Sequence, residues 1–191
     1  MYQKNFKKLF DITISLFLII SLSPLMIAIL FLISFFIGYP IYKQKRPGLN
    51  NKIFTIYKFK TLYDNFKTGS TYERHNRLGN FLRKTGLDEL PQLFNVLNND
   101  MSLVGPRPLL IEYLNKYSDY ENKRHLVKPG ITGLAQVYPS STGNKNWKNS
   151  IRLDVFYVKN ITFSLDLLII FKTIKIIFTS KKQYRDFKKS F

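Results

Sequence analysis

The sequence has no cysteine, two histidines and only 12 acidic residues among its 191 residues. Without cysteine, the chain can form neither a disulfide bond nor a zinc site built on thiolates. His75 and His125 are too few for a histidine-rich metal site. Any metal would therefore be held by oxygen atoms, which are the ligands that Mg²⁺ and Mn²⁺ prefer.

The shortage of acidic residues leaves a formal net charge of +18, with 30 lysines and arginines. A charge of that size indicates an anionic partner, which can be nucleic acid, an acidic lipid or a phosphate-rich substrate. The length suits one compact domain with an appendage. The sequence contains no internal repeat and no low-complexity tract.

A long run without charged residues extends from Ile12 to Tyr42 and is divided near the middle of its apolar part by Ser23-Pro24. The apolar part is long enough to cross a bilayer. A proline inside a helix frees a backbone carbonyl, and an adjacent serine can satisfy it. Two interpretations stay open: a kinked helix that spans the membrane, and a re-entrant helix that leaves by the face it entered.

Basic residues flank both ends of this run, at Lys4, Lys7, Lys8, Lys43, Lys45 and Arg46. Lysine and arginine mark the cytoplasmic side of a membrane segment. A spanning helix would place one of the two basic clusters on the outer side. The charge pattern therefore favours the re-entrant helix.

Two adjacent carboxylates, Asp88 and Glu89, stand where a helix is expected to start. Pro91 is tolerated in the first turn of a helix, because the N–H groups there have no partner. This pattern predicts Asp88 as the N-cap and Glu89 as the first helical residue. Taken alone, the pair is explained by capping and by the helix dipole.

The segment Pro106-Arg107-Pro108 gives the carboxylate pair a second interpretation. Two prolines fix the backbone on both sides of one arginine, and a planar guanidinium can hold a phosphate through two parallel hydrogen bonds. A carboxylate nucleophile with a phosphate-binding arginine indicates phosphoryl chemistry. Further along the chain, Asp154 is either an additional Mg²⁺ ligand or a partner for Arg152.

Aromatic and basic residues are interleaved in the predicted strand 53–60. Such a strand can stack the bases of single-stranded nucleic acid. It can equally pack its aromatic side chains inward and expose its lysines. No RNA-binding signature accompanies the strand, and we therefore expect no nucleic-acid partner. A membrane-tethered nucleic-acid-binding protein and a non-catalytic scaffold remain alternatives, but neither needs both the Asp-Glu pair and Pro-Arg-Pro.

The sequence resembles the bacterial sugar transferases of the monotopic phosphoglycosyl transferase family, in particular its small single-domain members. The matching segments follow the family order over nearly the whole chain: Lys7-Lys8 with Asp11, Ser23-Pro24, 44–48, 57–61, 87–96, 100–108, 127–133 and 153–158. Each segment alone is weak evidence, but the combination is highly specific. The sequence departs from the family pattern at Leu134 and at Tyr138-Pro139, which leaves the sugar undetermined.

The resemblance implies transfer of a phospho-sugar from a UDP-sugar to polyprenyl (undecaprenyl) phosphate, with UMP released and Mg²⁺ required. This would be the first membrane step in the assembly of a glycan. The resemblance implies Asp88 as the nucleophile that forms a covalent aspartyl phospho-sugar, Glu89 as the Mg²⁺ ligand and Arg107 as a phosphate-binding residue. It also implies that Ser23-Pro24 sets the membrane bend. The basic residues expected to hold the substrate phosphates are Arg46, Lys60, Arg83 and Arg107.

We therefore expect an α+β fold in three parts. A re-entrant membrane hairpin with its basic flank occupies residues 1–42. A small, mainly helical catalytic domain with a short sheet and interfacial helices occupies 43–180, and a basic tail occupies 181–191. The expected location is the inner (cytoplasmic) membrane, where the protein is monotopic and its catalytic domain lies on the cytoplasmic face of the lipid bilayer.

Overall fold

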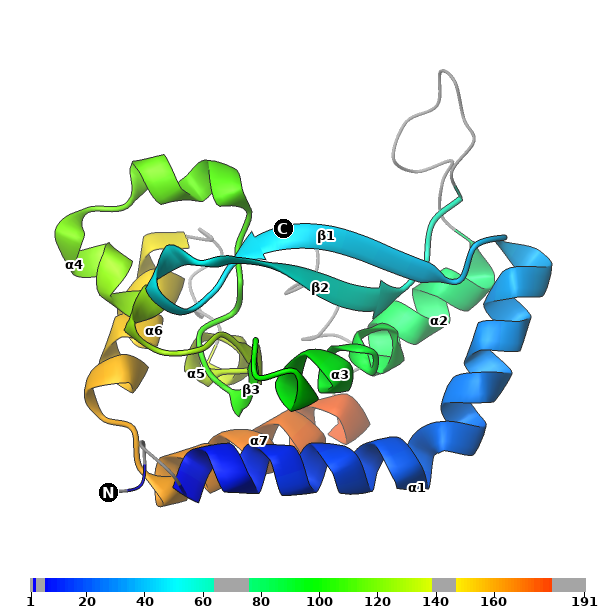
Figure 1. Ribbon diagram of the computed structural model, residues 1–191, viewed down its shortest axis with the longest axis horizontal. Helices are drawn as coiled ribbons and strands as arrows, with labels where there is room; N and C mark the ends of the chain where they lie inside the picture. Colours follow the sequence, from blue (N-terminus) through cyan, green and yellow to red (C-terminus); the bar gives the residue numbers. More distant parts are fainter. Residues whose placement is uncertain (1, 3–5, 64–75, 139–146, 180–191) are drawn as a thin grey trace.

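The computed structural model describes residues 2, 6–63, 76–138 and 147–179. Helices dominate, and two small two-stranded sheets accompany them (Figure 1). This confirms the predicted mixed fold. In chain order the elements are α1 (Lys7–Phe36), β1 (Ile41–Pro47), η2 (Leu49–Asn51), β2 (Ile53–Phe59), α2 (Arg77–Thr85), η3 (Leu87–Glu89), α3 (Gln92–Leu97), β3 (Ser102–Val104), η4 (Ile111–Lys116), α4 (Asp119–Asn122), η5 (Lys123–Leu126), β4 (Gly130–Thr132), α5 (Leu134–Val137), α6 (Trp147–Lys159) and α7 (Phe163–Thr179).

The first helix is 30 residues long and bends sharply partway along its length (Figure 1). Pro24 lies inside it and has no N–H group to donate to the carbonyl of Ile20, four residues earlier. The hydroxyl of Ser23 donates to that carbonyl instead, with an O–O distance of 2.8 Å. The serine therefore satisfies the carbonyl that the proline leaves free, as the sequence predicts.

Both halves of α1 contact the rest of the chain. In the first half, the Asp11 carboxylate accepts hydrogen bonds from the Ser102 hydroxyl at 2.6 Å and from the Leu103 N–H group at 3.2 Å. The second half joins a buried cluster with β2 and α2, formed by Met26, Ile29, Ile33, Phe59 and Leu82. The two halves are thus attached to one domain on either side of the bend.

Strands β1 and β2 form an antiparallel hairpin, with Ile41 opposite Phe59 and Pro47 opposite Ile53. The predicted strand at 53–60 is confirmed. Residues 44–47 belong to β1 and pair with β2. The chain turns later, at Asn50 and Asn51, whose φ angles are 50° and 61°. Asparagine tolerates this left-handed conformation better than most residues do.

Strands β3 and β4 run parallel, with Ser102 opposite Gly130 and Val104 opposite Thr132. A β-carbon on Gly130 would lie only 2.1 Å from the Gly105 nitrogen. Glycine is therefore required where the two strands approach each other, directly before Pro106-Arg107-Pro108. The close approach fixes the starting point of that segment.

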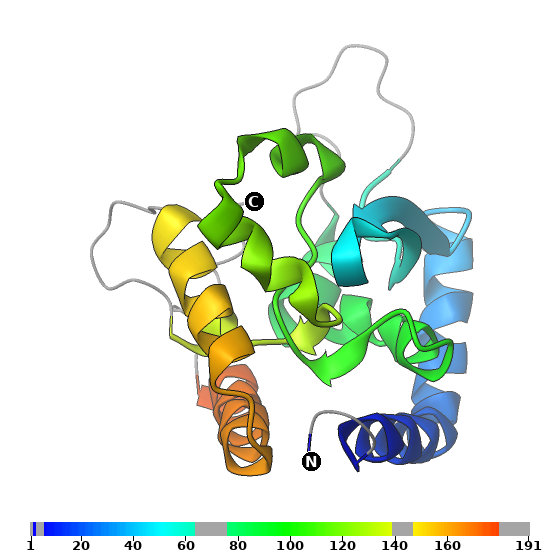
Figure 2. The same cartoon turned by 60° about the vertical axis from the view of Figure 1, so that its left-hand side comes forward.

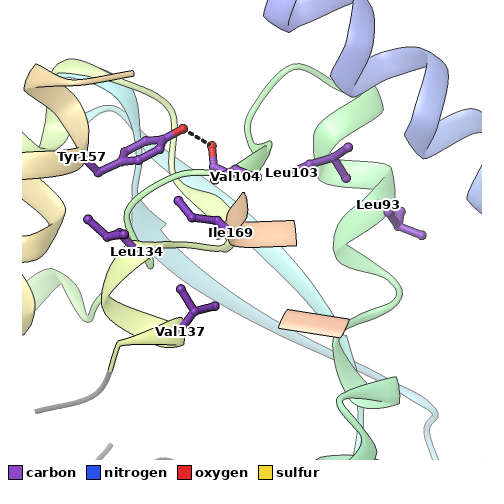
Figure 3. Close-up of a cluster of buried hydrophobic side chains, with 7 residues drawn as sticks. All are labelled: Leu93, Leu103, Val104, Leu134, Val137, Tyr157 and Ile169. Atoms are coloured by element: carbon purple, nitrogen blue, oxygen red, sulfur yellow. Dashed lines mark hydrogen bonds between the residues drawn. The ribbon is translucent and has the colours of Figure 1, made fainter. Parts of the chain in front are cut away.

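The largest buried cluster joins α3, β3, α5, α6 and α7, and Figure 3 shows its side chains: Leu93, Leu103, Val104, Leu134, Val137, Tyr157 and Ile169. The Tyr157 hydroxyl donates to the Val104 carbonyl at 3.0 Å and to Asp166 Oδ1 at 2.7 Å. Burial raises the pKa of Tyr157, and the adjacent carboxylate raises it further. The Tyr157 hydroxyl therefore keeps its proton and, as a hydrogen-bond donor, connects α6, β3 and α7.

Helix α7 runs along the base of the domain, on the same side as the first half of α1 (Figures 1 and 2). Lys7 Nζ lies 2.5 Å from Asp166 Oδ2 and joins the two helices by a partly buried ion pair. Among the described residues, α1 alone is long and apolar enough to cross a membrane. About half of its large apolar side chains are exposed, which is unusual for a helix surrounded by water.

Candidate active site

Asp88 and Glu89 lie in the short turn η3, between α2 and α3. Gly86 ends α2 with a φ of 73°, a left-handed conformation that glycine adopts without strain. The chain then turns directly into η3, where the Glu89 N–H group donates to the Gly86 carbonyl at 3.0 Å.

The prediction that Asp88 caps a helix is wrong. Gly86 precedes η3 and Pro91 precedes α3, and neither helix has a side-chain hydrogen bond at its cap. Asp88 nevertheless is only 6% exposed. A buried carboxylate is costly unless it is compensated by nearby charge or hydrogen bonds. Helix capping therefore does not explain the buried position of Asp88, and the compensation must come from the charged side chains around it.

Asp88 and Glu89 line a polar pocket of about 210 Å³. Cationic side chains from β1, β2, α2 and the segment after β3 share its wall, and these are Arg46, Lys58, Arg83 and Arg107. Gln92, from the first turn of α3, adds an amide. Two carboxylates among four cations form a site that suits a strongly anionic ligand.

Glu89 connects two of these cations. Its Oε1 atom accepts from Lys58 Nζ at 2.9 Å and from Arg107 Nη2 at 3.0 Å. The main-chain carbonyl of Arg107 accepts from Arg124 Nη2 at 2.6 Å. The guanidinium of Arg107 is thus fixed through both its side chain and its backbone, in addition to the two prolines beside it.

Arg46 and Arg83 are held in the same way by polar neighbours. Arg46 Nη2 donates to Gln44 Oε1 at 2.6 Å, and Arg83 donates to Thr61 Oγ1 and Asn80 Oδ1 at 3.2 and 2.6 Å. Burial lowers the pKa of both arginines. The positive charge of Arg107 lowers that of Arg46 further, whereas the Asp88 carboxylate raises that of Arg83. An anion bound between Arg46 and Arg107 would relieve their repulsion.

The structure brings five of the predicted site residues together in the pocket: Arg46, Arg83, Asp88, Glu89 and Arg107. It does not bring Lys60 or Asp154 there. Lys60 is buried just beyond the end of β2. Asp154 lies in α6 and accepts from Arg124 Nε and Nη2 at 3.2 and 2.7 Å. The partner of Asp154 is therefore Arg124, where the sequence suggested Arg152.

Sequence reasoning missed Lys58 and Arg124. Lys58 stands two residues before Lys60 in the strand predicted at 53–60, so strand alternation assigns both to one face and cannot choose between them. Arg124 is 1% exposed, and its partner Asp154 is 30 residues away. No local sequence pattern reveals a buried ion pair of that separation.

The carboxylate pair fits Mg²⁺ in its chemistry. Among the described segments, no group of three or more histidine, aspartate or glutamate side chains converges. Mg²⁺ does not need such a group, since one or two carboxylates commonly hold it together with water and substrate phosphates. Asp88 and Glu89 are the carboxylates that line this pocket.

A second cavity, of about 280 Å³, adjoins the polar pocket. Helices α1, α3, α5 and α7 supply apolar side chains to its wall, including Ile14, Leu18, Leu93, Val137, Ile170, Ile174 and Ile177. Glu89 and Arg107 line both cavities. A ligand with a charged head and a long apolar tail would therefore find both environments side by side.

The sequence profile of the bacterial sugar transferase family matches residues 2–180. An uncharacterized sugar transferase of Bacillus subtilis is 42% identical over 92% of this chain and 88% of its own length. The undecaprenyl-phosphate galactose phosphotransferase of Salmonella typhimurium is 38% identical over 90% of this chain, which corresponds to 40% of the relative. An Aeromonas hydrophila UDP-N-acetylgalactosamine-undecaprenyl-phosphate N-acetylgalactosaminephosphotransferase is 39% identical over 91% of this chain and 44% of its own length. The chain thus spans most of one relative and less than half of the other two.

Proposed function

Because the chain belongs to the bacterial sugar transferase family, we propose that it moves a phospho-sugar from a UDP-sugar to polyprenyl phosphate and releases UMP. The observation that carries the proposal is the junction of the two cavities at Glu89 and Arg107. The polar pocket suits a sugar diphosphate, and the apolar cavity suits the lipid acceptor. The names of the Salmonella and Aeromonas relatives include undecaprenyl phosphate.

The reaction proceeds in two displacements at one phosphorus atom. An oxygen of the Asp88 carboxylate attacks the phosphorus that carries the sugar, and the bond from this phosphorus to the bridging oxygen breaks. The electron pair leaves with UMP, and Asp88 keeps the phospho-sugar as an acyl phosphate. A phosphate oxygen of the acceptor then attacks the same phosphorus. The carboxylate of Asp88 departs unchanged, and polyprenyl diphosphate sugar is formed.

The cations of the pocket make the first displacement feasible. A carboxylate and a diphosphate repel each other, and Arg46, Arg83 and Arg107 provide positive charge on the wall that the two anions share. Lys58 and Arg107 hold Glu89 beside the nucleophile. Mg²⁺, when bound by Asp88 and Glu89, would neutralise charge on the diphosphate and on the leaving UMP.

The acceptor's apolar tail occupies the cavity between α1 and α7. Replacing Ile174 with aspartate puts a charge on the wall of this cavity. We expect the KM for undecaprenyl phosphate to rise at least about tenfold. Formation of the covalent intermediate from the UDP-sugar alone should keep its rate, which intact mass spectrometry measures.

Leu167→Asp is the matched control. Leu167 lies on the same helix, is 43% exposed against 49% for Ile174, and does not line the cavity. If both variants raise the KM equally, the effect comes from weaker membrane attachment of α7, and the cavity is not the acceptor site.

The re-entrant form of α1 belongs to the same proposal. A straight helix of 30 residues is about 45 Å long, which would carry its two ends to opposite sides of a bilayer. In the structure both halves contact one domain, through Asp11 on one side of the bend and Met26, Ile29 and Ile33 on the other. Together with the flanking basic residues, this supports a monotopic protein whose catalytic domain lies on the cytoplasmic face of the inner membrane.

Pro24→Ala tests the bend. Alanine restores the N–H group that the Ile20 carbonyl lacks, and we expect a fraction of the molecules to adopt a straight, spanning helix. The chain has no native cysteine, so a cysteine added before Met1 and an Asn50→Cys substitution each give a single label. In the parent protein both should be protected from an impermeant reagent in intact cells. In Pro24→Ala one of them should become labelled. If one of the two sites were labelled in the parent protein, the ends of α1 would lie on opposite faces and the helix would not be re-entrant.

Nucleotide release tests the reaction itself. Purified protein in detergent receives Mg²⁺, undecaprenyl phosphate and a panel of UDP-sugars, and the released nucleotide is identified by chromatography. The proposal predicts UMP with one or a few sugars, and none after chelation of the metal. Release of UDP would mean that a sugar without its phosphate is transferred, and the mechanism above would be wrong.

A further inference from the structure

A third cavity, of about 310 Å³, shares no lining residue with the two that serve the reaction. It lies where the start of α1 meets β3 and the segment before β4. Lys7, Lys8 and Lys128 line it together with Asp11 and Ser102. The proposed reaction uses none of these side chains, and the cavity therefore needs another explanation.

Positive charge predominates in this cavity. Asp11 is the one acidic side chain among its lining residues, and its two oxygens already accept from Ser102 and the Leu103 N–H group. Lys7 is paired with Asp166 on α7 and lies 4.0 Å from Asp11, and Lys128 directs one of its three N–H groups to Asn99 Oδ1. Burial lowers the pKa of Lys128, and the positive charges of Lys8 and Lys7 lower it further, while Asp11 and Asp100 act in the opposite direction. Lys8 and Lys128 thus lie close enough to repel each other.

The residues around the cavity suit a lipid headgroup. Lys7 and Lys8 form the first turn of α1, directly before its apolar run, where Leu9 and Phe17 are 65% and 66% exposed. Leu126, another lining residue, is itself 61% exposed. Lysines at the end of a lipid-facing helix lie at the depth of the phosphate groups. An exposed leucine beside them suits the apolar part of a lipid.

We propose that this cavity binds the phosphate of an anionic phospholipid, with phosphatidylglycerol as the representative, between Lys8 and Lys128. The bound headgroup relieves the repulsion between the two lysines and holds the first half of α1 at the membrane surface. This site is separate from the acceptor site, because the phosphate of the acceptor must reach Asp88. The inference rests on the cavity and its charges and does not depend on the proposed reaction.

Calorimetric titration of the full-length protein in a neutral detergent tests the site. The ligands are dihexanoyl phosphatidylglycerol, dihexanoyl phosphatidylcholine and inorganic phosphate. The test variant is Lys8→Gln/Lys128→Gln, with Lys8→Gln alone as the alternative should the double variant fold poorly. The control is Lys52→Gln/Lys148→Gln, which removes the same charge from two exposed lysines that line none of the three cavities.

Phosphatidylglycerol should bind the parent protein and the control variant at one site with equal affinity. The affinity of the test variant for phosphatidylglycerol should fall about tenfold or more, since each lysine near an anionic phosphate strengthens its binding. If the test variant bound phosphatidylglycerol as tightly as the parent protein does, the proposed site would be wrong. Equal binding of phosphatidylcholine would overturn its charge selectivity, and equal binding of inorganic phosphate would show an anion site that does not recognise lipid.

Discussion

Replacing Asp88 with asparagine is expected to lower UMP release by about four orders of magnitude or more, because the substitution removes the attacking oxygen of the first displacement. Asparagine has nearly the same shape as aspartate, and Asp88 lies outside the cap positions of the helices on either side of it. The melting temperature should therefore change little. The protein mass after incubation with UDP-sugar should lack the phospho-sugar adduct.

Asp119→Asn is the control for this experiment. Asp119 lies in the first turn of α4, is exposed and belongs to neither cavity of the reaction. Full UMP release and a normal adduct are expected. If Asp88→Asn still transferred the phospho-sugar at an appreciable rate, the acceptor would attack the UDP-sugar directly. A covalent step through Asp88 would then be ruled out, although the overall reaction would stand.

Replacing Arg124 with methionine is expected to destabilise the protein by about 3–5 kcal/mol. Arg124 is 1% exposed and Asp154 is 3% exposed, so the change leaves a buried carboxylate without its cation. Burial already raises the pKa of Asp154, and Arg124 opposes that shift. The melting temperature should fall by roughly 6–20 °C for a chain of this size, as measured by circular dichroism.

The double variant Arg124→Met/Asp154→Leu separates stability from positioning. Removing both members of a buried ion pair commonly restores most of the stability. The Arg107 carbonyl still loses the hydrogen bond from Arg124, and the Arg107 guanidinium is then less well placed against Glu89. We expect the melting temperature to recover and kcat for UMP release to stay about tenfold low. Recovery of both would show that Arg124 has only a structural function.

Five of the residues chosen from the sequence line the polar pocket, and backbone restrictions position two of them. Arg107 is fixed by two prolines, and Asp88 follows a glycine whose left-handed conformation redirects the chain. The same glycine explains why the cap prediction failed, since the chain enters η3 without the extended residue that a capping side chain requires.

Long-range pairings were not predictable from the sequence. Strand β4 has three residues and pairs with β3, which lies about 28 positions earlier along the chain. Lys58 contacts Glu89 across 31 positions, whereas Lys60 lies past the end of β2. Alternation along a strand would place both lysines on the same face. Because β2 ends between them, Lys58 lines the pocket and Lys60 does not.

Glu89 and Arg107 line both cavities, and this shared wall determines the order in which UMP leaves and the acceptor phosphate enters. In-line attack on a phosphorus places the incoming oxygen opposite the departing one. The acceptor phosphate must therefore enter the position that UMP has just vacated, beside the same two side chains. The lipid and the nucleotide exclude each other there, so added UMP should compete with the acceptor. Two displacements of this kind return the phosphorus to its original configuration, and the enzyme would transfer the phospho-sugar with net retention.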